Sequence, residues 1–474
     1  MPEPLQPAAL ALGVNLAGYF DAWAGVGEAA RHLRDGLQAA GVAIAPLLLS
    51  SRGMARDEAG APALYGGEAT HPVTLVCANP DGMVGARDEL GATAFDGRYV
   101  VGMWWWEVAA IPPRWLRAFD LVDEVWVGSR FVADVLAAVA PVPVVHVPLP
   151  VPEPVCSSAS RAALGLPEDR FLFGFAFDYA SVAGRKNPLG LIEAFARAFP
   201  AGAADGDDVA LVLKTLGGER HPEQHAAVLA AAASHPQVRV VDAQLAAADK
   251  NALIRALDCY VSLHRSEGFG LTIAEAMLLG TPVVATDYGG SRDFVTAFNA
   301  LLVDASPVAI GPGHDPYPAD GAWAEPDLDH AAAQLRVARA DPQAARARAR
   351  RARSDVLAAH APAAAGRAMA DRLARVLHHP HDGAGRAAGL DLRGVRERMA
   401  TGPRPAPGGD RGARAAVRAA ALRAMRPYSA HQRLVDEELL RALQSLDERV
   451  RGLAAGQQAL AAELARLRRH NGST

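Results

Sequence analysis

Short apolar runs alternate with helical segments along most of the chain, and this alternation constrains the fold more than any other feature. The first run, LGVNLAG, ends in glycine and precedes a segment in which Ala29, Leu33 and Leu37 recur at helical spacing. The runs VAIAPLLL, VTLVCANP, RYVVGMWWW and EVWVGS follow in turn. Strands that alternate with helices indicate βαβ units and a parallel sheet.

A proline-rich stretch near 141–155 separates this block from a second one of the same kind. PVPVVHVPLPVPEPV suits a stiff, extended linker. After it, the apolar runs FLFGFAF, VALVLKTL, VRVVDA, DCYVSL and TPVVATD alternate with helical patterns. We therefore predict an α/β fold with two Rossmann-like, doubly wound parallel-sheet domains that face a cleft. The first covers 1–149, with a helix near 360–377 that crosses back to it, and the second covers 150–359.

The last part of the chain has a different character. The stretch over 381–425 is rich in Gly, Pro and Arg and predicts a flexible linker. The stretch over 426–470 predicts a helical coiled coil, because apolar positions from Leu439 to Leu467 step alternately by four and three residues, with Gln457 as a polar interruption. We expect homo-oligomers to form through this segment. The alternative is an amphipathic helix that packs on its own domain.

Composition excludes several classes of protein. Half of the residues are hydrophobic and 21% are charged, which is ordinary for a globular protein. The formal net charge of −4 argues against nucleic acid as a partner. The three cysteines are widely spaced, without a CxxC or Cys/His cluster, so neither disulfides nor a metal site are predicted. No basic residues precede the N-terminal apolar run, and no uncharged apolar run reaches about 18 residues. We expect a cytoplasmic protein, with peripheral attachment at the inner face of a membrane as the alternative.

Lysine is rare in this chain. Of the 48 basic residues only Lys186, Lys214 and Lys250 are lysines, and the others are arginines. A compact ammonium and a planar guanidinium are not equivalent, so a lysine that is retained in such a chain is a candidate for a specific role. Chance retention is the alternative.

The segment SLHRSEGFGLTIAEAMLLGTPVVATDYGGSRD, residues 262–293, has the richest pattern. A strand ends in a loop that contains Glu267, and a helix that begins near Leu271 carries Glu275. Open α/β sheets bind ligands at the carboxyl ends of their strands, and helix N-termini bind anions. We therefore expect Glu275 to bind a ribose diol and Glu267 to face sugar hydroxyls. The residues expected to line a diphosphate are Gly268, Phe269, Gly270, Leu271 and Thr272. A helix start with incidental acids is the alternative.

A second motif, DYASVAGRKNPLGLIEAF, places Arg185 and Lys186 at the start of a predicted helix. Cations there oppose the helix macrodipole, so an anionic ligand would explain them. A solvated basic turn is the alternative. Lys214 stands at the end of the next predicted strand, where it would reach the same ligand or lie exposed to solvent.

These motifs resemble those of bacterial-type retaining glycosyltransferases of family 4, which have the GT-B fold and an E-x7-E motif. The resemblance rests on E-G-F-G-L-x-x-x-E-A-M and R-K-N-P-x-x-L-I-x-A-F, and it covers about residues 10–377. It implies that Glu275 binds the nucleotide ribose and Glu267 the donor sugar. It also implies that Arg185 and Lys186 neutralise the diphosphate leaving group. These three, Lys186, Arg185 and Glu267, are the expected catalytic residues.

The resemblance extends to the first block. In similar enzymes a glycine loop, here Gly25 and Gly27, closes over the donor phosphates or the acceptor, and a plain helix start is the alternative. The WWWE element places Trp106 and Glu107 on the acceptor side, where an aromatic face could stack on a sugar and a carboxylate could bind hydroxyls. His264, close to Glu267, is a further acceptor-side candidate, with a structural role as its alternative.

The implied function is transfer of a hexosyl group, of the mannose or glucose type, from a nucleoside-diphosphate sugar to a glycan or lipid-linked acceptor, in cell-surface polysaccharide biosynthesis. No cofactor and no metal are expected. A non-catalytic sugar-binding or scaffold protein is the first alternative. A dinucleotide-dependent oxidoreductase is a weaker one, because no G-x-G-x-x-G is followed by an acid about 20 residues on.

Overall fold

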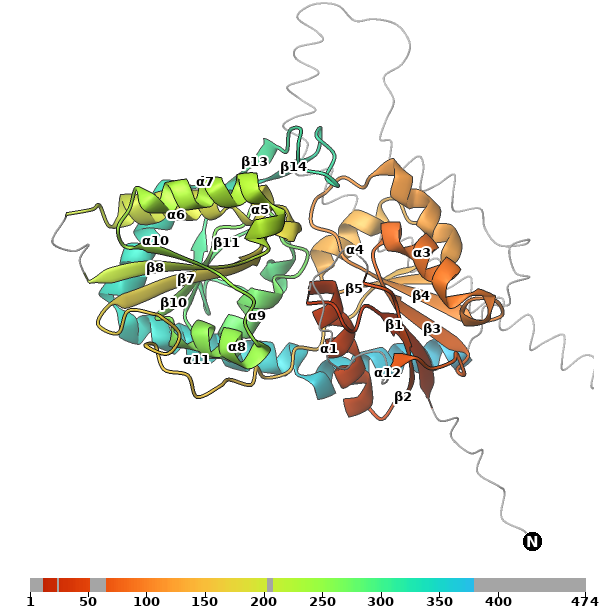
Figure 1. Ribbon diagram of the computed structural model, residues 1–474. Coiled ribbons are helices and arrows are strands. Elements are labelled where there is room, and N and C mark those ends of the chain that lie inside the picture. Colours follow the sequence, from red (N-terminus) through yellow and green to blue (C-terminus); the bar gives the residue numbers. More distant parts are fainter. Residues whose placement is uncertain (1–11, 24, 52–64, 203–207, 379–474) are drawn as a thin grey trace, which may run out of the picture. The chain divides into compact units, whose positions relative to one another are not determined.

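Two six-stranded parallel sheets form the framework of the computed structural model (Figure 1). The structure describes residues 12–23, 25–51, 65–202 and 208–378, which belong to one unit that ends at Ala384. The predicted α/β fold with two parallel-sheet halves is confirmed. The linker and the coiled coil predicted over 381–425 and 426–470 lie outside the described residues.

The first sheet has the strand order β2-β1-β3-β4-β5-β6, with neighbouring strands parallel. Its central strands are buried, which explains why they appear in the sequence as continuous apolar runs. The strands are β1 (Gly13–Gly18), β2 (Ala43–Leu48), β3 (Val73–Cys77), β4 (Tyr99–Trp104), β5 (Glu124–Val127) and β6 (Val144–His146). The helices of this half are α1 (Gly25–Ala39), α3 (Pro80–Leu90) and α4 (Arg130–Ala137).

The second sheet has the order β12-β11-β10-β7-β8-β9, also parallel. Its strands are β7 (Phe171–Asp178), β8 (Val209–Leu216), β9 (Val238–Asp242), β10 (Cys259–Ser262), β11 (Val283–Thr286) and β12 (Leu301–Val303). Its helices are α5 (Ala183–Lys186), α6 (Pro188–Ala198), α7 (Pro222–Ala233), α8 (Ala247–Ala256), α9 (Leu271–Leu278), α10 (Leu328–Ala340) and α11 (Pro342–His360). A separate antiparallel hairpin consists of β13 (Ala305–Ala309) and β14 (Ala322–Pro326).

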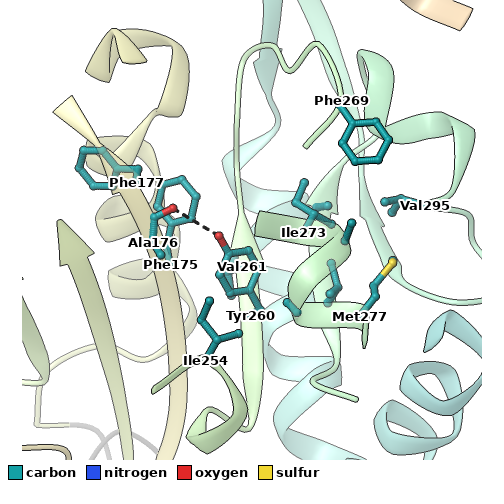
Figure 2. Close-up of a cluster of buried hydrophobic side chains, with 14 of the residues drawn as sticks. Phe175, Ala176, Phe177, Ile254, Tyr260, Val261, Phe269, Ile273, Met277 and Val295 are labelled. Atoms are coloured by element: carbon teal, nitrogen blue, oxygen red, sulfur yellow. Dashed lines mark hydrogen bonds between the residues drawn. The ribbon is translucent and has the colours of Figure 1, made fainter. Parts of the chain in front are cut away.

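Apolar side chains fill the space between the second sheet and α9 (Figure 2). Tyr260 of β10 is fully buried, and its hydroxyl donates a hydrogen bond to the carbonyl of Ala176 on the neighbouring strand at 3.3 Å. Ile273 and Met277 lie one turn apart on α9. They are buried on the side of β10 that faces away from Ala176. This packing fixes α9, and with it the loop that precedes α9.

The last described helix, α12 (Pro362–His378), returns to the first sheet. Gly366 packs so closely on α1 that a Cβ at this position would lie 2.0 Å from the carbonyl oxygen of Gly36. Arg372 donates from Nε to the buried carboxylate of Glu124 on β5 at 2.8 Å. Both contacts tie the end of the described chain to the half in which it began.

Candidate active site

The loop between β10 and α9 turns sharply into its helix at Gly270. This residue has a φ of +91°, in the left-handed region that favours glycine, and it is the N-cap of α9. Leu271 and Thr272 are the first residues of the helix, at the end where backbone N–H groups are free of intrahelical partners. A Cβ on Gly268 would lie 2.7 Å from the carbonyl oxygen of Trp106, so the loop lies directly against the WWWE element.

Glu267 is buried between two cations. Lys186 donates from Nζ to Glu267 Oε1, and Arg185 Nη1 lies 3.1 Å from Glu267 Oε2. Burial by itself would raise the pKa of this carboxyl, but the charges of Lys186 and Arg185 outweigh it and lower the pKa to about 2. Glu267 is therefore a carboxylate at neutral pH, and the three side chains together keep one positive charge.

The two cations directly precede the helix at whose start the sequence placed them, and they belong to a short helix of their own. Residues 183–186 form the short helix α5, and Asn187 then takes a left-handed conformation with φ +56° and caps α6. Its side-chain oxygen accepts from Gly190 N at 3.2 Å, and its amide nitrogen donates to Leu263 O at 3.0 Å. Arg185 and Lys186 therefore stand at the end of α5 and directly before α6. Their side chains contact Ser266 and Glu267 of the β10–α9 loop.

Glu275 is held by a residue that sequence reasoning left out of the site. Lys250 of α8 donates from Nζ to both carboxylate oxygens of Glu275, at 2.8 Å each. Lys250 is also close enough to lower the pKa of Lys214, although burial of Lys214 is the main cause of that shift. Lys214 is buried and donates to Thr215 O at 3.0 Å. The only signal for Lys250 was its rarity, as one of three lysines in the sequence.

The glycine pair 289–290 is the second omission. The backbone N–H of Gly290 donates to Glu267 O at 2.7 Å, and a Cβ on Gly290 would lie 1.9 Å from Gly268 O. Gly289 has φ +83°, and a Cβ there would lie 2.6 Å from Glu267 O. The two glycines thus permit a close contact that fixes the backbone under Glu267. The GG pair directly after a predicted strand could have indicated it.

Glu107 joins the site through contacts with the second half of the chain. The hydroxyl of Tyr317 donates to Glu107 Oε2 at 3.0 Å, and Ser266 Oγ donates to the Glu107 carbonyl. Trp106 is buried, donates from Nε1 to Ala110 O at 3.0 Å and packs its ring against Tyr317. Trp106 is thus a packing residue in this structure, whereas Glu107 is a partly exposed residue.

The other predicted site residues have structural partners. His264 is buried, and burial lowers its pKa. Its Nε2 lies 3.1 Å from the carbonyl of Tyr288 and its Nδ1 lies 3.0 Å from Ser262 Oγ, so the neutral ring donates from Nε2 and accepts at Nδ1. Phe269 packs against Phe294, with the ring centroids 5.0 Å apart.

The glycine turn of the first block begins α1. A Cβ on Gly27 would lie 2.4 Å from Ala22 O, so tight local packing accounts for that glycine. A Cβ on Gly25 would meet open space, and local packing does not explain it.

Two further observations concern the described residues alone. Within 12–378, apart from the gaps in that range, no group of three or more His, Cys, Asp or Glu side chains is arranged to hold a metal ion. Among the helices of the same residues, none is both long enough and apolar enough to cross a membrane.

Comparison with known proteins supports a glycosyltransferase. Residues 181–310 match a family described as glycosyl transferases group 1. The lipopolysaccharide core biosynthesis mannosyltransferase LpsB of Rhizobium meliloti (strain 1021) is 60% identical over 42 residues, which are 9% of this chain and 12% of that protein. The D-inositol 3-phosphate glycosyltransferase of Nocardioides sp. (strain ATCC BAA-499 / JS614) is 34% identical over 195 residues, 37% of this chain and 38% of the relative. The matches thus span well under half the length of either relative.

A solved structure shows the fold. HepE of Anabaena, crystallised in complex with UDP and glucose, aligns with 77% of this chain and 100% of its own, at a TM-score of 0.57 and 16% identity. The fold is GT-B. In this fold the family match covers the β10–α9 loop and α5, the two segments that bring Glu267, Arg185 and Lys186 together.

Proposed function

We propose that this protein is a retaining, family 4 glycosyltransferase that takes a hexosyl group from a nucleoside-diphosphate sugar. The observation that carries the proposal is the burial of Glu267 between Arg185 and Lys186, beside the start of α9. The fold and the family match support the class of reaction.

The charge at this site suits a diphosphate. Arg185 and Lys186 exceed Glu267 by one positive charge, and the N-terminus of α9 adds a partial positive charge and free N–H groups. Arg185 is itself fixed, because its Nη1 donates to Ser266 O at 2.9 Å and its backbone carbonyl accepts from Arg265 N at 2.8 Å. Cations that are held in place before the reaction can stabilise the charge that grows on a departing diphosphate without reorganising.

Glu275 is proposed to bind the ribose. It lies one turn inside α9 from Leu271, and its carboxylate can accept two hydrogen bonds from a vicinal diol. Lys250 already donates to both oxygens, so the diol would share the carboxylate with this ammonium. A carboxylate that is paired in this way keeps its orientation before the nucleotide binds.

For the chemical step we propose front-side transfer with retention. The bond between the sugar's anomeric carbon and the diphosphate oxygen breaks as the acceptor oxygen attacks from the same face. The leaving phosphate oxygen takes the acceptor's proton. Lys186, Arg185 and the α9 N-terminus stabilise the departing anion, and Glu267 orients the sugar hydroxyls. This route needs neither a metal nor another cofactor.

The finer assignments extend the same proposal. LpsB is named a mannosyltransferase and HepE was crystallised with UDP and glucose, so mannose and glucose donors are the first to test. We propose a glycan or lipid-linked acceptor in cell-surface polysaccharide synthesis, on the cytoplasmic side of the membrane. We also propose that the protein forms homo-oligomers through the coiled coil predicted over 426–470.

The test combines a binding screen with two variants. Purified protein is screened by thermal shift against a panel of nucleotide sugars that includes UDP-glucose and GDP-mannose, and release of nucleotide is then measured. Glu275→Ala and Lys186→Ala should each abolish turnover while the protein remains folded, as judged by circular dichroism, although the loss of an ion-pair partner lowers the melting temperature of each. Glu193→Ala removes an exposed glutamate on α6 and is the matched control. Turnover at the wild-type rate in both site variants would overturn the assignment.

A further inference from the structure

The β13–β14 hairpin is anchored to the loop that carries Glu267. Arg265 binds Glu325 of β14 through two hydrogen bonds, Nε to Oε2 at 2.5 Å and Nη2 to Oε1 at 2.9 Å. The same guanidinium donates from Nη1 to Gly184 O at 2.7 Å, and the carbonyl of Arg265 accepts from Ala324 N at 2.9 Å. Because Gly184 precedes Arg185 and Arg265 closely precedes Glu267, the hairpin is fixed with respect to the proposed diphosphate site.

The segment that connects the two strands of this hairpin contains Tyr317, which contacts Glu107. The Tyr317 ring packs on Trp106 with centroids 5.2 Å apart, and only 7% of the residue is exposed. Its hydroxyl donates to Glu107 Oε2 at 3.0 Å. Glu107 therefore has its backbone fixed by Ser266 and one carboxylate oxygen fixed by the hairpin.

Glu107 lies close enough to the groups that are proposed to bind the donor for its charge to act on them. Its charge acts on Arg185 and Lys186, and Tyr317 in turn interacts with Arg185 and Glu267. Burial, together with the charge of Glu107, raises the pKa of Tyr317 well above its ordinary value, although Arg185 opposes that rise. The phenol thus stays protonated and remains a hydrogen-bond donor at neutral pH.

We propose that Tyr317 is a positioning residue for sugar transfer: it holds Glu107 so that the second carboxylate oxygen, Oε1, accepts a hydrogen bond from the attacking hydroxyl as the acceptor binds. In the transfer step this proton passes to the leaving phosphate oxygen, and Glu107 is left unchanged. This inference rests on the proposed function. A glutamate side chain has three rotatable bonds, and a fixed carboxylate orients the nucleophile at a lower entropic cost than a free one. In this role the hairpin is a part of the acceptor side of the site.

The experiment uses water as the attacking hydroxyl, so no acceptor has to be known. Hydrolysis of UDP-glucose and of GDP-mannose is measured at saturating donor, and donor Kd is measured separately. Tyr317→Phe keeps the ring and removes the hydroxyl. We expect the hydrolysis rate to fall about tenfold, which corresponds to about 1.4 kcal/mol, while donor Kd changes less than about twofold. A residue with only a structural role would not separate rate from binding in this way.

Three further variants complete the test. Glu107→Gln alters the same hydrogen bond from its other partner, and we expect a rate loss at least as large, again with donor Kd retained. In the double variant the two losses should not add, because both changes act on one interaction. Tyr99→Phe is the matched control, since the Tyr99 hydroxyl also donates to a buried glutamate, Glu124, at 3.2 Å on the first sheet.

The outcomes separate this inference from the proposed function. A wild-type protein that turns over neither nucleotide sugar overturns the proposed function, and the inference falls with it. If the wild type is active, an unchanged rate in Tyr317→Phe or in Glu107→Gln overturns the inference alone. Additive losses in the double variant, or an equal loss in Tyr99→Phe, would also overturn it. If Tyr317→Phe fails to fold, Glu107→Gln alone decides.

Discussion

Lys186 and Glu267 lie 81 positions apart in the chain and form a buried ion pair where α5 meets the β10–α9 loop. Arg185, on the same short helix as Lys186, also pairs with Glu267. The pair has consequences for stability as well as for binding, because without Glu267 the buried charges of Lys186 and Arg185 would lose their shared counter-ion.

The first prediction concerns acid stability. The folded pKa of Glu267 is lowered to about 2 from an ordinary value of 4.5, so its contribution is fully present above pH 4.5 and is lost as pH falls toward 2. At neutral pH this contribution is on the order of 3 kcal/mol. Glu267→Gln should therefore be less stable than wild type in urea denaturation at pH 7, and the difference should shrink as pH falls from about 5 to 2. A difference that is constant over this range would contradict the prediction.

The second prediction concerns Lys250. Glu275 is 4% exposed, so Lys250→Met leaves a buried carboxylate without its cation. We expect the free energy of unfolding to fall by roughly 1–3 kcal/mol, as measured by chemical denaturation. Arg197→Met breaks exposed pairs with Glu193 and Asp329 and should lower the free energy of unfolding much less than Lys250→Met does. Equal losses in the two variants would show that Lys250 stabilises the fold no more than a surface residue does.

The third prediction concerns Gly290. In Gly290→Ala the new Cβ would lie 1.9 Å from Gly268 O, and backbone cannot yield as a flexible side chain can. We expect a loss of roughly 1–3 kcal/mol in unfolding free energy and weaker binding of the nucleotide sugar that the thermal-shift screen selects. Gly85→Ala, in α3 with open space around it, should be neutral or stabilising by up to about 1 kcal/mol. Unchanged binding in Gly290→Ala would refute the proposed support for Glu267.

The fourth prediction tests the heptad pattern of the last segment. The double variant Leu446→Asp, Leu453→Asp should lower the oligomeric state of the full-length protein. Both positions belong to the apolar heptad series from Leu439 to Leu467 that predicts the coiled coil. Light scattering coupled to size exclusion measures the mass. Ala462→Asp, outside this series, should leave it unchanged. A monomeric wild type would contradict the predicted coiled coil.

Much of the fold was readable because periodicity is local. Parallel strands buried on both faces give apolar runs, and the runs named in advance include those that form β1, β3 and β4 of the first sheet and β7, β8 and β10 of the second. The residues around the two glutamates were readable for the same reason: strand, loop and helix follow one another within a single segment.

The residues that were missed are joined across long stretches of chain. Lys250 meets Glu275 from a different helix, and Tyr317 meets Glu107 across 210 positions. No local pattern encodes such contacts. Trp106 shows a related limit, because a tryptophan that packs in a core and one that offers its face to a sugar have the same sequence signature. The Arg185–Lys186 pair was selected from the sequence as a cation site, but its contact with Glu267, 81 positions away, was not predicted.

The return of α12 to the first sheet also bears on how the chain acquires its structure. During synthesis the first sheet emerges early, yet Glu124 receives its counter-ion only when Arg372 has been made, 248 positions later. Until then Glu124 lacks this counter-ion and α1 lacks the helix that packs on it, and the whole second sheet has to be synthesised in between. The half of the protein that is synthesised first therefore completes its packing last. A chain released before α12 has been made would lack the helix that packs on α1 and the arginine that pairs with Glu124.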